Sequence, residues 1–296
     1  MAADGNSASE ALWLAIRREA ETVLANDPIF GRSLSEAILD HSDLGAAVSY
    51  QIGQRLGKGA ADRRQFARIA GEAFAASPGL VEAARRDLEG IVLHAPASTA
   101  FLPALINFKG YVALQAWRVS NWHWHRDRRD LALLLQSESS DSLQVSIHPS
   151  ASIGTAVFLD HATGIVVGSF ASIGDEVTIM QNVTIGRNVE TPNRAPRIGR
   201  GVLLSTGATI IGDISIGDDA KIGAGSVVTG RAGRLYRGRC PRSPDQLPRA
   251  GSRLTAESIA PKGWQSSLHT WIPFVAVAEI RFGNLALTMI SVWLGA

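Results

Sequence analysis

The chain contains 296 residues, of which 46% are hydrophobic and 19% are charged, and its formal net charge is +2. This length leaves room for two domains, and the high apolar content with little net charge excludes a disordered chain and argues against a dedicated nucleic-acid binder. The single cysteine, Cys240, excludes a disulfide framework and a cysteine-based metal site, and without a signal-peptide pattern or a spanning apolar segment we expect a cytoplasmic protein with no membrane anchor.

The first half of the chain has the composition of a helical domain. Ala, Leu, Glu and Arg are common up to about residue 140, and β-branched residues are rare. Pro28, Pro78, Pro96 and Pro103 fall between the segments of helical periodicity, where helices should break. We therefore expect a helical domain over residues 1–142. The apolar spacing predicts helices over Glu10–Leu24, Leu34–Leu56, Arg64–Ala76, Gly79–Val92 and Asn107–Trp124, with Arg126–Leu135 as a continuation.

From Val145 onward, aliphatic residues recur at every sixth position. A period of six fits neither a helix nor a simple strand, but it fits a coil in which each side is one short strand and a turn. Three such hexads close one triangular coil of a β-helix, with the aliphatic residues stacked inside and Gly or small polar residues at the tight corners. The two series are offset by fifteen residues, which predicts an extra loop within Gly186–Arg197. They comprise Ile147, Ile153, Leu159, Ile165, Ala171, Val177 and Val183, and then Ile198, Leu204, Ile210, Ile216, Ile222 and Val228.

The hexad series ends at Val228, so we place the β-helix domain over residues 143–229 and an irregular tail over residues 230–296. Seven Arg residues lie between Arg231 and Arg253, together with Gly, Pro and Ser. Two interpretations of this run are a basic patch for an acidic partner and an unstructured tail.

One string in the β-rich half is highly specific, and it is accompanied by matches in both halves. The string is Asp160-His161-Ala162-Thr163-Gly164-Ile165-Val166-Val167-Gly168, and the further matches include His148-Pro149, Lys109-Gly110-Tyr111, Asp43–Tyr50 and Lys221–Val228. Together they resemble the serine acetyltransferase family over about residues 10–230. The resemblance implies an α+β protein whose helical domain precedes a left-handed parallel β-helix, with trimers that pair into hexamers. It also implies acetyl transfer from acetyl-coenzyme A to the hydroxyl of L-serine, without a metal, to give O-acetylserine for cysteine biosynthesis.

The resemblance assigns roles to individual residues. His161 corresponds to the catalytic base, and an imidazole has a pKa suited to removing the serine proton. Asp160 corresponds to a residue that helps to bind the substrate serine, and Arg194 could pair with the substrate carboxylate. Coenzyme A would lie in a groove between neighbouring β-helices. Small residues that would allow its close approach are Gly207, Ala208, Gly223 and Ala224.

The chain also departs from the family at three polar positions. The Asp that orients the catalytic base is Ser146 here, an Asp in the helical half is Ala95, and a His in the extra loop is Ala195. The hydroxyl of Ser146 can accept a hydrogen bond but cannot offset the charge of an imidazolium. These departures leave three interpretations open: a serine O-acetyltransferase with reduced activity, an acyltransferase with another acceptor, and a catalytically impaired structural or regulatory homologue.

The tail departs from the family as well. Family members continue with Asp-Val-Pro-Ala-Gly and Val-Gly-Val-Pro-Ala-Arg segments, and neither is present here. Codons for Gly230–Pro244 can be chosen so that, read one base later, they encode Asp-Val-Pro-Ala-Gly-Cys-Thr-Ala-Val-Gly-Val-Pro-Ala-Arg. We therefore hypothesise that residues from about 230 onward are out of the ancestral reading frame. In the family, docking to the sulfhydrylase of the pathway uses a C-terminal Ile, whereas this chain ends in Ala296, so that docking stays an open question.

Overall fold

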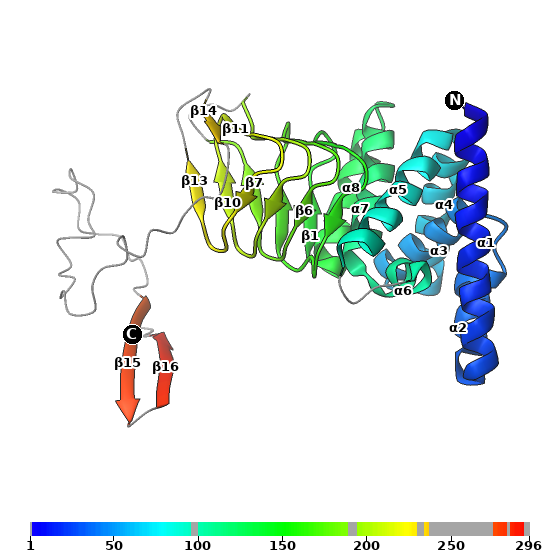
Figure 1. The fold of residues 1–296 in the computed structure, drawn as a ribbon, viewed down its shortest axis with the longest axis horizontal. Helices are drawn as coiled ribbons and strands as arrows, with labels where there is room; N and C mark the ends of the chain where they lie inside the picture. Colours follow the sequence, from blue (N-terminus) through cyan, green and yellow to red (C-terminus); the bar gives the residue numbers. More distant parts are fainter. Residues whose placement is uncertain are drawn as a thin grey trace. The chain divides into compact units, whose positions relative to one another are not determined.

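The computed structural model describes residues 2–95, 100–188, 194–229, 234–236, 275–282 and 285–292. The chain forms two compact units, Met1–Arg242 and Ser243–Ala296. In the first unit a helical half precedes a stack of short parallel strands (Figure 1). The helices are α1 (Ala2–Asn26), α2 (Gly31–Leu34), α3 (Leu44–Leu56), α4 (Ala60–Ala76), α5 (Pro78–His94), α6 (Phe101–Asn107), α7 (Lys109–Trp124) and α8 (Arg129–Leu143), with a 3-10 turn at Pro28–Phe30 and a π-helical turn at Ser35–Leu39.

The segment predicted as one helix over Leu34–Leu56 is interrupted. Its first residues form the π-helical turn, which ends when the backbone N–H of Asp40 donates to the Ser35 carbonyl at 2.9 Å. A new helix then begins after Asp43, whose carboxylate accepts the backbone N–H of Ala46 at 2.9 Å. An Asp at this capping position stabilises a helix start by about 1 kcal/mol, and this local signal outweighs the continuous apolar periodicity.

Two further expectations for the helical half are corrected. Arg126–Leu135 does not continue the preceding helix, because α7 ends at Trp124 and α8 begins at Arg129. Asp127 between them has a left-handed backbone (φ 56°), which a right-handed helix cannot accommodate. The short helix α6 has no counterpart in the sequence prediction. Pro103 lies in its first turn, where the missing N–H of proline has no intrahelical partner to lose.

The second half is a prism with three faces of parallel strands. Strand order is β1-β4-β7-β10-β13 on face A, β14-β11-β8-β5-β2 on face B and β12-β9-β6-β3 on face C. Each coil therefore contributes one strand to each face, which is the left-handed parallel β-helix of the predicted α+β fold. The strands are β1 (Val145–Ile147), β2 (Ser152–Ile153), β3 (Phe158–Leu159), β4 (Ile165–Val167), β5 (Ser172–Ile173), β6 (Thr178–Ile179), β7 (Thr184–Gly186), β8 (Arg197–Ile198), β9 (Leu203–Leu204), β10 (Thr209–Ile211), β11 (Ile214–Ile216), β12 (Lys221–Ile222), β13 (Val227–Thr229) and β14 (Arg234–Tyr236).

The interior of the prism confirms the hexad residues but corrects their stacking. All thirteen are buried, with at most 8% of any side chain exposed. Ile147 pairs with Val167, twenty residues later, whereas Ile198 pairs with Ile216, eighteen residues later. Two extra residues therefore enter between β3 and β4, at the corner where face C meets face A. Because of this insertion, the prediction that hexad residues stack directly on one another is wrong from Ile165 to Val183, where the stacked residues are Val167, Ile173, Ile179 and Ile185. The second series stacks as predicted, with Ile198 on Ile216, Leu204 on Ile222 and Ile210 on Val228.

The predicted extra loop is confirmed. Ile173 of β5 pairs with Ile198 of β8, twenty-five residues later, so this coil holds seven residues more than a regular coil between β7 and β8, and residues 189–193 of that segment lie outside the described residues. The tail predicted over residues 230–296 lies mostly outside the described residues. Within it, β14 pairs with β11, and in the second unit β15 (Val275–Phe282) pairs with β16 (Leu285–Val292) in antiparallel fashion. No described helix is long and apolar enough to cross a membrane.

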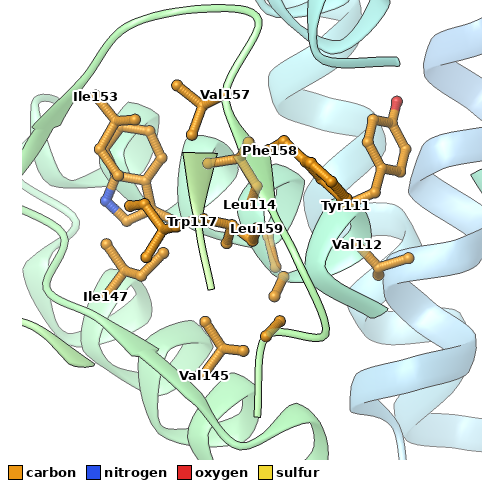
Figure 2. Packing of buried hydrophobic residues seen from close by; sticks show 14 of the residues in the cluster. Tyr111, Val112, Leu114, Trp117, Val145, Ile147, Ile153, Val157, Phe158 and Leu159 are labelled. Carbon is orange, nitrogen blue, oxygen red and sulfur yellow. The ribbon is translucent and has the colours of Figure 1, made fainter. Parts of the chain in front are cut away.

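Helix α7 packs directly on the first coil of the prism. Figure 2 shows Leu114 and Trp117 of α7 beside Ile147, Ile153 and Leu159, all of them buried. Gly110 makes the approach of α7 to β3 especially close, since a Cβ atom there would lie 2.1 Å from the carbonyl oxygen of Leu159. The helical half therefore supports the coil that leads into the Asp160 turn.

A buried ion pair fixes the same coil from the side. The Asp87 carboxylate of α5 accepts the Nε of Arg118 at 2.8 Å, the Nε2 of Gln115 at 2.8 Å and the backbone N–H of Val157 at 3.2 Å. Arg118 Nη2 also donates to the Gly154 carbonyl at 2.6 Å. Burial raises the pKa of the Asp87 carboxyl, and the Arg118 guanidinium opposes this rise. A buried charge of this kind is costly unless it is paired and hydrogen-bonded, as it is here.

Candidate active site

The two inserted residues are His161 and Ala162, in the turn between β3 and β4. Both have a left-handed backbone, with φ of 54° and 57°, a conformation that costs a non-glycine residue about 1–2 kcal/mol. Local hydrogen bonds hold the turn: the Ala162 N–H donates to the Asp160 carbonyl at 2.6 Å, and the Thr163 N–H donates to the His161 carbonyl at 2.7 Å. Ala162 is fully buried, while 73% of the His161 side chain is exposed. The insertion therefore presents the imidazole outside the prism wall.

Asp160 is the charged neighbour of this imidazole. Its Oδ1 lies 3.7 Å from His161 Nε2, and 29% of its side chain is exposed. This separation is too long for a hydrogen bond but short enough for the carboxylate to attract an imidazolium. An exposed imidazole beside a carboxylate can remove a proton from a bound hydroxyl and hold the resulting charge.

Ser146 lies on β1 of face A and is not paired with this imidazole. Its hydroxyl accepts a hydrogen bond from Gln136 Nε2 of α8 at 3.2 Å. The described residues record no hydrogen bond between Ser146 and His161. Ala95, another departure from the family, is buried at the end of α5, where its backbone N–H donates to the Ile91 carbonyl at 2.8 Å.

The small residues assigned to coenzyme A stack on the same corner as His161. Hydrogen bonds link the layers of this corner: Asn182 N–H to the Thr163 carbonyl at 2.8 Å, and Gly207 N–H to the Gln181 carbonyl at 3.0 Å. In the next layer, Gly223 is partly exposed and Ala224 is exposed. Gly207 has φ 68°, so it needs the freedom of glycine. Ala208 differs from the others, because its side chain is fully buried in the prism and cannot contact a ligand.

Arg194 lies on a different corner from His161. It precedes β8, where face A meets face B, and its Nη1 is 2.9 Å from Oδ2 of Asp213. His161 follows β3 in the first coil, whereas Arg194 precedes β8 in the third, a separation of about 10 Å along the prism from the spacing of strands. Ala195 beside it is buried and offers no polar atom. A single chain therefore presents the base and this guanidinium on separate corners.

Sequence reasoning missed two contacts that support the site. Lys109, at the start of α7, donates from Nζ to the hydroxyl of Thr163, two residues after His161. Asp87 anchors the first coil through Val157. The sequence contained a signal for the Asp87 contact. Asp87 shares the buried face of α5 with Leu88 and Ile91, and a lone carboxylate on an apolar helix face indicates a buried ion pair.

A cavity of about 870 Å³ lies in the helical half, between α1, α3, α4 and α5. None of the residues assigned to catalysis or substrate binding lines it, so we do not place the chemistry there. Among the described residues, no three His, Cys, Asp or Glu side chains come together as metal ligands.

Comparisons with known proteins cover both halves of the chain. Residues 12–116 match the family model "Serine acetyltransferase, N-terminal", and residues 195–230 match "Bacterial transferase hexapeptide (six repeats)". The serine acetyltransferase of Salmonella typhimurium is 40% identical over 220 residues, which cover 74% of this chain and 81% of the relative.

Two solved structures have similar folds. A serine acetyltransferase in complex with CoA has a TM-score of 0.73 at 35% identity, covering 78% of this chain and 96% of that one. Soybean serine acetyltransferase complexed with serine has a TM-score of 0.72 at 37% identity, covering 79% of this chain and 93% of that one. The helical half, the hexapeptide coils and the extent of these matches lead to one conclusion: the chain belongs to the serine acetyltransferase family.

Proposed function

We propose that this protein transfers the acetyl group of acetyl-coenzyme A to the hydroxyl of L-serine, giving O-acetylserine and free coenzyme A. The observation that carries the proposal is the exposed His161 on its inserted turn, in a chain that belongs to the serine acetyltransferase family. Relatives have been solved with CoA and with serine, which supports these two substrates. The product is an activated serine of the kind used in cysteine biosynthesis.

In the proposed reaction His161 is the general base. Its imidazole removes the proton of the serine hydroxyl as the oxygen attacks the thioester carbonyl. The bond from carbonyl carbon to sulfur then breaks, and the imidazolium returns the proton to the leaving thiolate of coenzyme A. In this proposal Asp160, whose Oδ1 lies 3.7 Å from His161 Nε2, stabilises the imidazolium and helps to bind the substrate serine.

We further propose that the site closes between two copies of the chain. His161 and Arg194 lie on separate corners of one prism, so an L-serine molecule held by both needs the second corner from a neighbour. A groove for coenzyme A along the small residues of the His161 corner would likewise need its second wall from a neighbour. Light scattering should therefore show a trimer or a dimer of trimers, and a monomer of 31.5 kDa at micromolar concentration would contradict this arrangement. A cytoplasmic location stays a prediction from the sequence.

The departure at Ser146 supports a second candidate function, which is acyl transfer to another hydroxyl. Release of the coenzyme A thiol from acetyl-coenzyme A, measured with and without L-serine, separates the candidates. Release that requires L-serine supports the main proposal. Release with other hydroxyl compounds and not with L-serine supports the second candidate, and no release with any acceptor supports a homologue that has lost turnover.

The role of His161 is tested in the same assay. His161→Ala should remove nearly all transfer while the fold is kept, and His94→Ala, at an exposed position on α5, serves as the control. Ser146→Asp restores the carboxylate that the family resemblance assigns to orienting the base, so it should raise turnover by offsetting the imidazolium charge. The two changes should be strongly non-additive. If Ser146→Asp raises turnover equally without His161, the base lies elsewhere.

A further inference from the structure

One buried carboxylate at the corner between faces A and B holds two arginines. Asp213 follows β10, and only 8% of the residue is exposed. Its Oδ2 is 2.9 Å from Arg194 Nη1, and its Oδ1 is 3.4 Å from Arg197 Nη1. Among the ion pairs of the described residues, this is the one carboxylate shared by two arginines. We call Arg194, Asp213 and Arg197 the arginine clamp.

The clamp carries unbalanced charge at the surface. Two guanidinium groups and one carboxylate leave a net charge of +1, whereas the nearby pair of Arg200 with Glu176 is neutral. The side chains of Arg194 and Arg197 are 61% and 66% exposed. In the hydrogen bonds among the described residues each uses Nη1, and the exposed remainder of each guanidinium faces solvent, where a ligand can approach.

Comparison with another arginine shows that the clamp is not simply a structural pair. Arg118 is also bound to a buried Asp, but only 6% of its side chain is exposed, and its second nitrogen donates to the Gly154 carbonyl. That guanidinium is held on Asp87 and Gly154 from Nε and Nη2 and is almost closed to solvent. The guanidinium groups of the clamp are instead held at one edge and open at the other, which is the arrangement that recognises a carboxylate.

We propose that Arg197 is a second substrate-binding residue, which joins Arg194 in binding the carboxylate of the acceptor substrate. Asp213 is the positioning residue, because it holds both long side chains in one place before substrate arrives and so reduces the entropy lost on binding. Ala195 between the two arginines contributes no polar atom, so Arg197 supplies the second donor. This inference rests on the proposed function, since it extends the role assigned there to Arg194.

The test compares L-serine with L-serinamide, which keeps the hydroxyl and the ammonium group but lacks the carboxylate. Arg197→Gln should lower kcat/KM for L-serine by about 10-fold or more, the effect of one charge-assisted hydrogen bond, mainly by raising the KM for L-serine. The KM for acetyl-coenzyme A and the kcat/KM for L-serinamide should not change. Arg200→Gln is the matched control, because Arg200 is a similarly exposed arginine of the same prism paired with one carboxylate.

Two further variants separate the possible failures. Arg194→Gln should lower kcat/KM for L-serine in the same way. If Arg194→Gln has no effect, the assignment of this corner to substrate binding in the proposed function is wrong, and the failure is not specific to Arg197. In an Asp213→Asn background, Arg197→Gln should have little further effect on kcat/KM for L-serine, because the second donor is no longer held in place. Calorimetric titration with L-serine gives the same comparison without turnover. Two results would overturn the role of Arg197. One is a kcat/KM for L-serine that is unchanged in Arg197→Gln, as in Arg200→Gln, while Arg194→Gln is impaired. The other is an equal loss of kcat/KM for L-serine and L-serinamide in Arg197→Gln, which would show that Arg197 does not bind the carboxylate.

Discussion

Replacing Gly110 by alanine tests how closely the helical half supports the catalytic turn. The new Cβ would lie 2.1 Å from the Leu159 carbonyl oxygen and 2.9 Å from the Leu159 Cβ. Because the nearest obstacle is backbone, no rotamer change can relieve the clash, and α7 must move by more than 1 Å relative to β3 (roughly, from ordinary contact distances). Overpacking of this kind costs about 1–3 kcal/mol. The helix-propensity gain of alanine over glycine is at most about 1 kcal/mol, so we expect net destabilisation of up to about 3 kcal/mol.

The matched control is Gly71→Ala in α4. The nearest atom to a Cβ there is Ser49 Oγ at 3.9 Å, so alanine fits and should stabilise the protein by up to about 1 kcal/mol. Chemical denaturation of both variants measures the difference, and each kcal/mol corresponds to a shift in melting temperature of roughly 2–4 °C. Gly110→Ala should also lower kcat, because Leu159 leads directly into Asp160 and His161. If the two variants change stability in the same direction, α7 does not press on β3 as the structure indicates.

Three other predictions address the prism, a buried histidine and the tail. Ile216→Asp should destabilise the fold by several kcal/mol, since it buries an unpaired carboxylate at a position 2% exposed. The control Ser215→Asp, on the outer face of the same strand, should be tolerated. Equal melting temperatures of the two variants would contradict the assigned interior. His123 is fully buried with neither ring nitrogen hydrogen-bonded among the described residues, and burial, followed by Arg128, lowers its pKa. The folded chain therefore binds this proton less readily than the unfolded chain. As pH falls below the unfolded pKa of about 6.5, the unfolded chain binds the extra proton and stability is lost, by up to about 1.4 kcal/mol per pH unit. His123→Leu should remove the part of this stability loss that comes from His123. The part from His148, whose pKa is also lowered by burial, should remain. A stability difference between parent and variant that stays constant from pH 8 to pH 5.5 (roughly the window set by the reference pKa) would show that His123 does not titrate in this way. Sequencing the gene across the codon of Gly230 should reveal a one-base shift that restores Asp-Val-Pro-Ala-Gly, and the hypothesis of an altered reading frame fails if no such shift does so.

The β-helix could be predicted from the sequence because its signal is local and repeated. Each hexad residue, such as Ile210 or Ile222, must be aliphatic for the same reason, which is that it fills the interior of a narrow prism. The helices were predicted less accurately at their ends. Apolar periodicity continues across Asp43 and Asp127, while a capping carboxylate and a left-handed residue decide where the chain actually turns.

The position of His161 illustrates the limit of a period read along the chain. A strict six-residue count passes through Leu159 and Ile165 without a break, because both are aliphatic and both are buried. Only strand pairing shows that Ile147 lies beside Val167, and hence that His161 and Ala162 are inserted residues. Register depends on hydrogen bonds between coils, and these are not encoded in the identity of any single residue.

The arginine clamp was likewise decided by tertiary structure. Arg194 and Arg197 are near neighbours in sequence, but Asp213 reaches them from the following coil, across the extra loop. The sequence alone determined that the thirteen hexad residues are buried, because the period is local, and the resemblance of the Asp160–Gly168 string to the family pointed to His161 as the base. The partners of Arg194, and the separation of Arg194 from His161, were set by how coils of 18, 20 and 25 residues stack. Charge pairing depends on distance in space, which only the stacked coils define.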